Sequence, residues 1–182
     1  MYKVEVGNYV KTVINDVVAL KKSGEAKAII SLLNKMCESP KDVMAALPNF
    51  DKDEITDEVL LYVDADVTVY YIATTPKIVY PPHEHAMVAI SAIYKGTETH
   101  LFYDREGDNV VERSQVRFQS PAVVDMAVET VHAILNEDAE PNESLHFYFG
   151  NLEDQKRTLW DSDGKNPQQY VQSDYDSFAK PY

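Results

Sequence analysis

The sequence has 182 residues, enough for one domain with a complete hydrophobic core but few for two. It carries 17 Lys and Arg residues against 30 Asp and Glu residues, and the resulting net charge of −13 argues against nucleic acid or an anionic membrane as a partner. The single cysteine, Cys37, excludes an internal disulfide and a cysteine-based zinc cluster.

The N-terminal segment carries charges throughout, and no run approaches the ~18 apolar residues of a membrane span. We therefore expect neither a signal peptide nor a transmembrane helix, and a cytoplasmic protein. We accordingly expect no nucleic acid and no membrane among its partners. The sequence leaves the oligomeric state open.

The first third of the chain has helical periodicity. Apolar residues recur at spacings of three and four from Val10 to Val18, which predicts a first helix. A second helix is predicted from about Glu25 to Cys37, where the cysteine is expected to be buried. A third helix is predicted to begin at Pro40, because proline is well suited to the first helical position.

From about Leu60 onward the residue pattern is typical of β-strands. Short runs rich in Val, Ile, Tyr and Phe are separated by Pro, Gly, Asp or Asn, a spacing that is typical of an all-β sandwich or barrel. After Gly150 the chain is polar with scattered aromatic residues, which predicts an irregular tail packed on the barrel. We expect a single domain over 1–182, composed of a helical lead-in (about 1–50), a barrel (about 55–150) and the tail (151–182).

Two histidines stand two positions apart in PPHEH, residues 81–85, at the start of a predicted strand. Side chains two apart on a strand point to the same face, and imidazole is the commonest side-chain metal ligand. His83 and His85 are therefore candidate metal ligands; the alternative is a solvent-facing pair at a strand edge. Glu84, between them, is predicted to point away into solvent.

His132, near the end of a later predicted strand, is the candidate third ligand. The alternative is a core histidine satisfied by backbone, with His100 as the substitute ligand. His100 itself is predicted to lie at the surface or the rim of the barrel; the alternative is that it faces the cavity. Asn136, four residues after His132, is interpreted as a turn residue.

In SLHFYFG, residues 144–150, three polar residues alternate with apolar ones. By the two-residue period of a strand, Ser144, His146 and Tyr148 share one face. A buried chain of this kind can orient a phenol and support proton transfer. The alternative is the polar face of a half-exposed strand.

A His-x-His pair followed by a glycine, a later His followed four residues on by Asn, and a Ser-x-His-x-Tyr triad together resemble the cysteine dioxygenase-like (thiol dioxygenase) group of the cupin superfamily. The matching residues are His83, His85, Gly96, His132, Asn136, Ser144, His146 and Tyr148. The resemblance covers roughly residues 40–160. It implies a mainly β fold, the cupin double-stranded β-helix or jelly-roll barrel, with an α-helical N-terminal lead-in.

The resemblance also implies a function. The protein would be a non-haem dioxygenase that binds one Fe(II) ion per chain through the three histidines and adds O₂ to the sulfur of a small thiol, giving a sulfinate. Tyr148, oriented by His146 and then Ser144, would be the proton donor or hydrogen-bond partner. Zinc or nickel is an alternative metal, since three imidazoles with an open position suit several divalent ions.

The sequence departs from the family pattern at two positions near the metal. The glutamate that usually follows the His-x-His pair is absent, because Ala89 and Ile90 stand where it should fall. The site would therefore consist of three neutral imidazoles. The cysteine that mammalian-type members link to the tyrosine is also absent, and Cys37 lies in the helical lead-in, so no such crosslink is expected.

The arginine that holds the substrate carboxylate in this family is absent as well, because the first arginine of the chain is Arg105, after the His-x-His pair. Candidate replacements are Lys77, Tyr70, Tyr71, Tyr80 and Arg157; alternatively, the substrate has no carboxylate. The missing arginine also leaves open a three-histidine cupin dioxygenase that cleaves a diketone or an aromatic substrate. A third alternative is a non-catalytic cupin that binds a metal or a small ligand.

Overall fold

The computed structural model describes residues 1–48 and 56–182. It begins with three helices, α1 (Asn8–Ser23), α2 (Ala26–Cys37) and α3 (Pro40–Ala46). Gly24, with φ 76°, adopts the left-handed conformation that ends α1, and Pro40 begins α3, so the three predicted helices are confirmed. None of the helices in the described ranges has the length and apolar character that a membrane crossing requires.

The strands that follow form two antiparallel sheets. The first sheet has the order β1-β2-β10-β5-β8, with bounds β1 (Thr56–Val63), β2 (Thr68–Thr74), β5 (Ala89–Lys95), β8 (Ala122–Met126) and β10 (Asn142–Tyr148). The second sheet is centred on β9, which pairs with β3 and β4 along one side and with β6 along the other, while β7 pairs with β6. Its bounds are β3 (Ile78–Val79), β4 (His83–Glu84), β6 (Thr97–Glu106), β7 (Asn109–Gln119) and β9 (Val131–Asn136).

The pairing order identifies the architecture. If β3 and β4 are counted as one interrupted strand, the strands from β2 to β10 can be renumbered 1 to 8 along the chain. In this numbering, β2-β10-β5-β8 is the order 1-8-3-6, and β3/β4-β9-β6-β7 is the order 2-7-4-5. This is the strand order of a jelly roll built from two Greek keys. The expected mainly β double-stranded β-helix with a helical lead-in is therefore confirmed.

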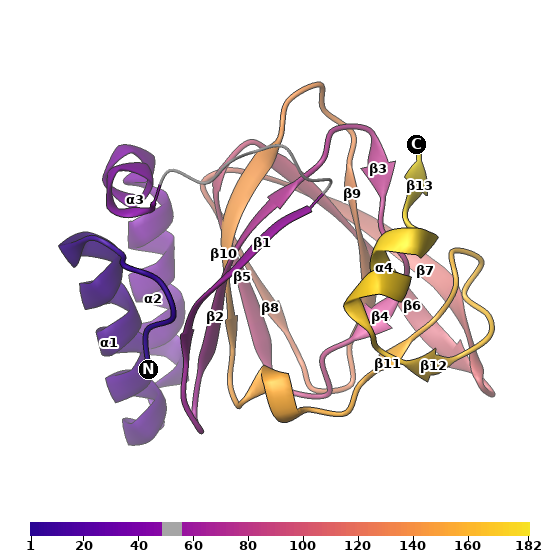
Figure 1. Cartoon of the computed structure of the whole chain (residues 1–182), viewed down its shortest axis with the longest axis horizontal. Helices are drawn as coiled ribbons and strands as arrows, with labels where there is room; N and C mark the ends of the chain where they lie inside the picture. The colour runs from indigo at the N-terminus through magenta and orange to yellow at the C-terminus, as the bar shows by residue number, and fades with distance from the viewer. Residues whose placement is uncertain (49–55) are drawn as a thin grey trace.

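The central strands of the first sheet, β5 and β10, are buried on both faces. On β10, Leu145 and Phe147 pack with the three helices in the largest hydrophobic core, and neither is exposed. The alternating residues His146 and Tyr148 point the opposite way, into the barrel, and are also buried. Figure 1 shows the helices against one side of the barrel and the C-terminal segment against the other.

The C-terminal segment is more regular than the sequence suggested. It contains a 3₁₀ turn, η1 (Leu152–Asp154), the strands β11 (Thr158–Leu159), β12 (Gln168–Gln169) and β13 (Lys180–Pro181), and the helix α4 (Gln172–Phe178). β11 pairs with β4 and β13 pairs with β3, so the segment extends the second sheet. The prediction of an irregular tail was wrong because two-residue strands are too short to show any periodicity.

Candidate metal centre

Strand pairing brings the three candidate ligands together. His83 on β4 lies opposite His132 on β9 in the antiparallel register, which makes their side chains cross-strand neighbours. His85 follows β4 directly, and Ala86, with φ 53°, then turns the chain. One ring nitrogen from each histidine lies within 4.8 Å of the others, and the Nε2 atoms of His85 and His132 are 3.5 Å apart.

The three donors fit a divalent transition metal. Metal–imidazole bonds of about 2.1 Å allow one ion to bridge nitrogens at the 3.5 Å spacing of His85 and His132. Nδ1 of His83 lies 3.1 Å from the carbonyl oxygen of Pro81, which can accept its hydrogen and leave Nε2 for a metal. Burial, helped by the positive charge of Arg157, lowers the pKa of His83 to about 3. Burial also lowers the pKa of His85 and of His132 well below 6.5, so all three imidazoles are neutral ligands at pH 7.

Glu84, expected in solvent, is instead part of the scaffold. Its carboxylate accepts hydrogen bonds from Arg105 and, at 3.1 Å, from the backbone N–H of Thr158. Its side chain is only 14% exposed. Glu84 thus ties the short strand that carries His83 to the C-terminal segment and to β6.

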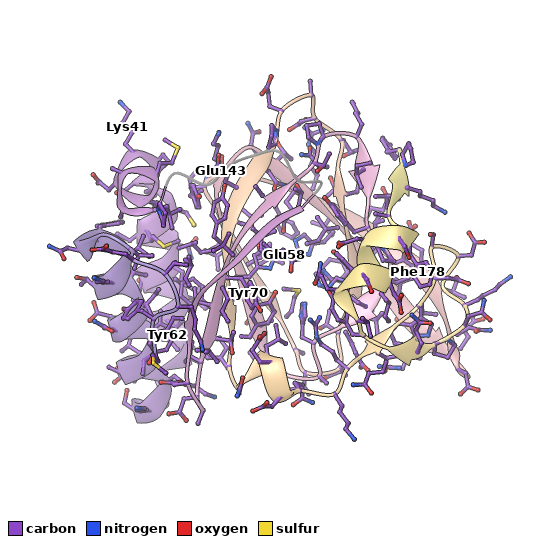
Figure 2. The ribbon with its side chains drawn as sticks, viewed as in Figure 1. Lys41, Glu58, Tyr62, Tyr70, Glu143 and Phe178 are labelled. Atoms are coloured by element: carbon purple, nitrogen blue, oxygen red, sulfur yellow. The ribbon has the colours of Figure 1, made fainter. Side chains whose placement is uncertain are left out.

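The histidines adjoin a cavity of about 590 Å³ between the first sheet and the C-terminal segment. His83, His85 and Tyr148 contribute to its wall. Figure 2 shows two further lining residues, Glu58 and Tyr70, in the middle of the molecule. The C-terminal segment supplies Glu153, Arg157, Gln169, Tyr170, Gln172, Tyr175 and Asp176.

Only some of the residues considered for binding a substrate carboxylate line this cavity. Tyr70, Tyr80 and Arg157 line the cavity. Tyr71 instead packs in the core between the first sheet and the helices. The Nζ atom of Lys77 donates a hydrogen bond to the carbonyl oxygen of Glu137, and Lys77 is not among the lining residues. Arg157 is therefore the cationic residue that the cavity offers to an anionic group.

Carboxyl groups share the cavity with Arg157. Burial raises the pKa of Glu58 to about 7, although the positive charge of Arg157 acts in the opposite direction. The Tyr70 hydroxyl donates to Oε1 of Glu153 at 2.5 Å, and Asp176 lines the same space. One guanidinium, several carboxyl groups and several phenols give this cavity a polar lining.

Tyr148 and His146 face the cavity from β10, as the two-residue period predicted. The Tyr148 hydroxyl lies 3.3 Å from Nδ1 of His146, and the Tyr148 ring centroid is 4.9 Å from that of His85. Burial raises the pKa of Tyr148 well above 10, so the phenol keeps its proton at neutral pH. A protonated hydroxyl is thus held beside the three histidines.

The contacts of Ser144 differ from the expected series. The hydroxyl nearest Nε2 of His146 is that of Ser91 on β5, at 2.9 Å. Ser144 instead directs its hydroxyl to Oε2 of Glu98, at 3.4 Å. The reason lies in the barrel: β5 is paired beside β10, with Ser91 opposite His146, so a hydroxyl from the neighbouring strand comes closer than one on the same strand.

His100 is not at the rim as expected; it is fully buried behind the third candidate ligand. Its Nδ1 atom lies 3.1 Å from Nδ1 of His132, and its Nε2 atom lies 2.6 Å from Oε1 of Glu98. Burial would raise the pKa of Glu98, but hydrogen bonding, above all to His100, outweighs it and holds the pKa below its usual range. A carboxylate therefore stands near the three-imidazole group without being among its three donors.

Sequence reasoning missed Glu98 and Ser91. The available signal was the alternation in TETHLF, residues 97–102, where the two-residue period puts Glu98 and His100 on one face. The partner strand that this face would meet could not be identified from the sequence.

Asn136 has the turn role that was expected. Its Nδ2 atom donates to the carbonyl oxygens of Thr74 and Glu140, at 3.0 and 3.1 Å, and its Oδ1 atom accepts the backbone N–H of Asp138 at 3.0 Å. These bonds close the loop between β9 and β10. Asn136 therefore secures the strands that carry His132 and His146.

No protein-family model and no curated protein matches the chain. Similar solved structures include an RmlC-like cupin family protein with a double-stranded β-helix fold from Methanocaldococcus jannaschii (16% identity, 59% of this chain and 92% of that chain, TM-score 0.47). Another is the protein KdgF from a Halomonas species (13% identity, 58% and 89%, TM-score 0.46). A variant of oxalate decarboxylase from Bacillus subtilis is similar over a smaller part of its length (14% identity, 52% and 24%, TM-score 0.42).

Proposed function

We propose that the chain is a cupin of the cysteine dioxygenase-like type, which binds one Fe(II) ion through His83, His85 and His132 and converts a small thiol to its sulfinate. The observation that carries the proposal is the convergence of three neutral imidazoles with a protonated tyrosine, Tyr148, at one polar cavity. A three-nitrogen donor set leaves positions open for substrate and O₂.

The reaction balances without an outside reductant. A thiolate and O₂ give a sulfinate, RS⁻ + O₂ → RSO₂⁻: the O–O bond breaks, two S–O bonds form, and the electrons that oxygen gains come from sulfur. Bound iron would supply the O₂ chemistry, as cofactors do in such reactions. The chain supplies the ligands, the orientation of the substrate and the hydrogen bonds around it.

Tyr148 is the residue best placed to contact the reacting groups. Its hydroxyl lies beside the ring of His85 and is held by His146. Such a hydroxyl can hydrogen-bond to substrate or to oxygen and can exchange a proton with His146. The C-terminal segment contributes Tyr170 and Tyr175 to the wall of the same cavity.

Arg157 is the residue that we assign to an anionic group of the substrate. A guanidinium binds a carboxylate with two parallel hydrogen bonds, and Arg157 lines the same cavity as His83 and His85. The preferred substrate is therefore expected to carry a carboxylate as well as its thiol.

The proposal is tested by oxygen uptake. Protein loaded anaerobically with Fe(II) is mixed with small thiols that differ only in whether they carry a carboxylate, and the products are identified by mass spectrometry. We expect stoichiometric uptake and a sulfinate. The matched control is the His132→Ala variant treated in the same way, which should consume no substrate-dependent oxygen. Uptake only with diketones or aromatic compounds would reject the thiol assignment, and an inactive protein that binds iron would reject the enzyme assignment.

A further inference from the structure

Glu98 is a fully buried carboxylate whose contacts run in two directions. Its Oε1 atom lies 2.6 Å from Nε2 of His100 and 3.1 Å from Oγ of Ser91. Its Oε2 atom lies 3.4 Å from Oγ of Ser144 and 3.9 Å from Nε2 of His146. These partners are hydroxyls and imidazoles, not lysine or arginine. Burying a carboxylate among such partners is costly, which suggests that the charge has a role beyond packing.

The first direction leads to the third metal ligand. A carboxylate only accepts hydrogen bonds, so Nε2 of His100 carries the hydrogen and donates to Glu98. In neutral His100 the Nδ1 atom is then an acceptor, and it lies 3.1 Å from Nδ1 of His132. The Nδ1 atom of His132 must therefore carry a hydrogen, which leaves its Nε2 atom unprotonated and free to bind a metal.

The second direction leads to Tyr148. Ser91 has a single hydroxyl hydrogen, which Glu98 accepts, so Oγ of Ser91 accepts the Nε2–H of His146 at 2.9 Å. The Nδ1 atom of His146 then carries no hydrogen and accepts the hydroxyl of Tyr148 at 3.3 Å. The Tyr148 oxygen consequently presents its lone pairs to the cavity.

We propose that Glu98 is a positioning residue whose carboxylate sets the direction of both hydrogen-bond chains, exposing Nε2 of His132 to the metal and holding Tyr148 as a hydrogen-bond acceptor toward the substrate. This inference rests on the proposed function, because the orientation of the hydrogen bonds to His132 and Tyr148 affects the chemistry only when a metal is bound. Before turnover, the Tyr148 oxygen would therefore accept a hydrogen bond from a substrate S–H or N–H group. It could donate a hydrogen bond to the substrate only after His146 changes its tautomer.

Glu98→Gln tests the proposal without altering the size of the side chain. The glutamine must keep its oxygen toward His100, whose Nε2–H needs an acceptor, so its NH₂ group takes the place of Oε2 near His146. A donor at that position favours the opposite tautomer of His146, with hydrogen on Nδ1. We expect NMR of labelled imidazole nitrogens to show the Nε2–H tautomer of His146 in the parent protein and the Nδ1–H tautomer in Glu98→Gln, both free of metal.

The two series of hydrogen bonds that start at Glu98 can be examined separately in the zinc-loaded protein, which is diamagnetic. His100→Gln should lower zinc affinity by about 10-fold to 100-fold, as loss of a ligand's hydrogen-bond partner does, and leave the His146 tautomer unchanged. Ser91→Ala should change the His146 tautomer and leave the zinc affinity unchanged. If Glu98→Gln does not fold, these two variants carry the test.

Glu143→Gln is the matched control, because Glu143 is also a buried glutamate but lies on the opposite face of β10 from Ser144 and His146, where it contacts Tyr94 and Lys95. It should change neither tautomer nor zinc affinity. The proposal is overturned if the parent shows the Nδ1–H tautomer of His146, or if neither Glu98→Gln nor Ser91→Ala changes it. Expected tautomers in a protein that oxidises no thiol would instead overturn the proposed function and leave the role of Glu98 standing.

Discussion

The guanidinium carbon of Arg157 lies 3.3 Å from the centroid of the Tyr170 ring. Arg157 precedes β11 and Tyr170 precedes α4, so this stacking contact joins two parts of the C-terminal segment at the cavity wall. Cation–π stacking orients a guanidinium while its N–H groups stay available to an anion. The C-terminal segment therefore forms part of the candidate substrate site and not only a cover for the barrel.

Replacing Arg157 should affect substrates selectively. In Arg157→Gln, the KM for a carboxylate-bearing thiol should rise by about 10-fold to 100-fold, the effect of losing a charge-assisted hydrogen bond. The KM for a matched thiol without a carboxylate should change little. Arg157→Lys should restore only part of the loss, because an ammonium group does not form the paired contact. Equal effects on both thiols, measured by steady-state oxygen uptake, would contradict this role.

Glu58 should make stability depend on pH. Its folded-state pKa, about 7, lies above the ordinary value of 4.5 because of burial, so the folded protein binds this proton more tightly than the unfolded chain does. Relative to Glu58→Gln, the parent should therefore lose stability as the pH rises from about 4.5 to about 7 and stay constant above that. Denaturant unfolding over this pH range checks the prediction, with the exposed Glu140→Gln as the control. A parent protein that gains stability relative to Glu58→Gln as the pH rises through this range would contradict it.

Each of the three candidate ligands should be needed for metal binding. His83→Ala, His85→Ala and His132→Ala should each weaken binding of zinc or Fe(II) by more than about 100-fold, beyond the loss typical of residues that only support a ligand. The control is His146→Gln, which should retain the metal because His146 is not one of the three grouped nitrogens. Calorimetric titration and metal analysis measure both. Retention of full affinity by any of the three alanine variants would remove that residue from the site.

Tyr148→Phe should separate metal binding from turnover. The substitution removes only the hydroxyl that contacts His146, so iron should bind as in the parent protein. We expect turnover to fall by about 100-fold to 10,000-fold, the range for loss of a positioned proton-transfer group. Tyr70→Phe, which removes a neighbouring phenol hydroxyl bonded to Glu153, is the matched control and should cost much less. A Tyr148→Phe variant as active as the parent would refute the role of the tyrosine.

Asn136 should contribute to stability and not to metal chemistry. Asn136→Ala leaves the buried carbonyl group of Thr74 and the partly buried carbonyl group of Glu140 without the amide donor, which should cost about 1–3 kcal/mol of unfolding free energy. Zinc affinity per folded molecule should remain close to that of the parent. Denaturant unfolding together with zinc titration distinguishes this result from a large loss of affinity at unchanged stability, which would point to a role at the metal.

Features that depend on local periodicity could be predicted from the sequence. The three helices, the β-barrel and the common face of Ser144, His146 and Tyr148 all follow from spacings of two, three or four residues. The burial of Cys37 in α2 follows in the same way. The spacing of apolar residues indicates which face of a helix or strand is buried, without identifying the element that packs against it.

Contacts that depend on strand pairing could not be predicted from residue spacing, and the grouping of His83, His85 and His132 was expected only from the family resemblance. Ser91 displaces Ser144 from His146 because β5 lies beside β10, and His100 reaches His132 because β6 lies beside β9. Arg157 reaches the cavity through pairing of the two-residue strand β11 with β4. Each of these neighbours is distant in the sequence, and no spacing within a strand encodes the register between strands.

The most direct test of the central claim is the fate of isotopically labelled O₂ during turnover of the Fe(II)-loaded protein with a carboxylate-bearing thiol. We predict that mass spectrometry will find both oxygen atoms of one labelled molecule in the sulfinate product, with none taken from water. Label recovered as hydrogen peroxide or water, with the thiol converted only to a disulfide, would show that the site is not a thiol dioxygenase.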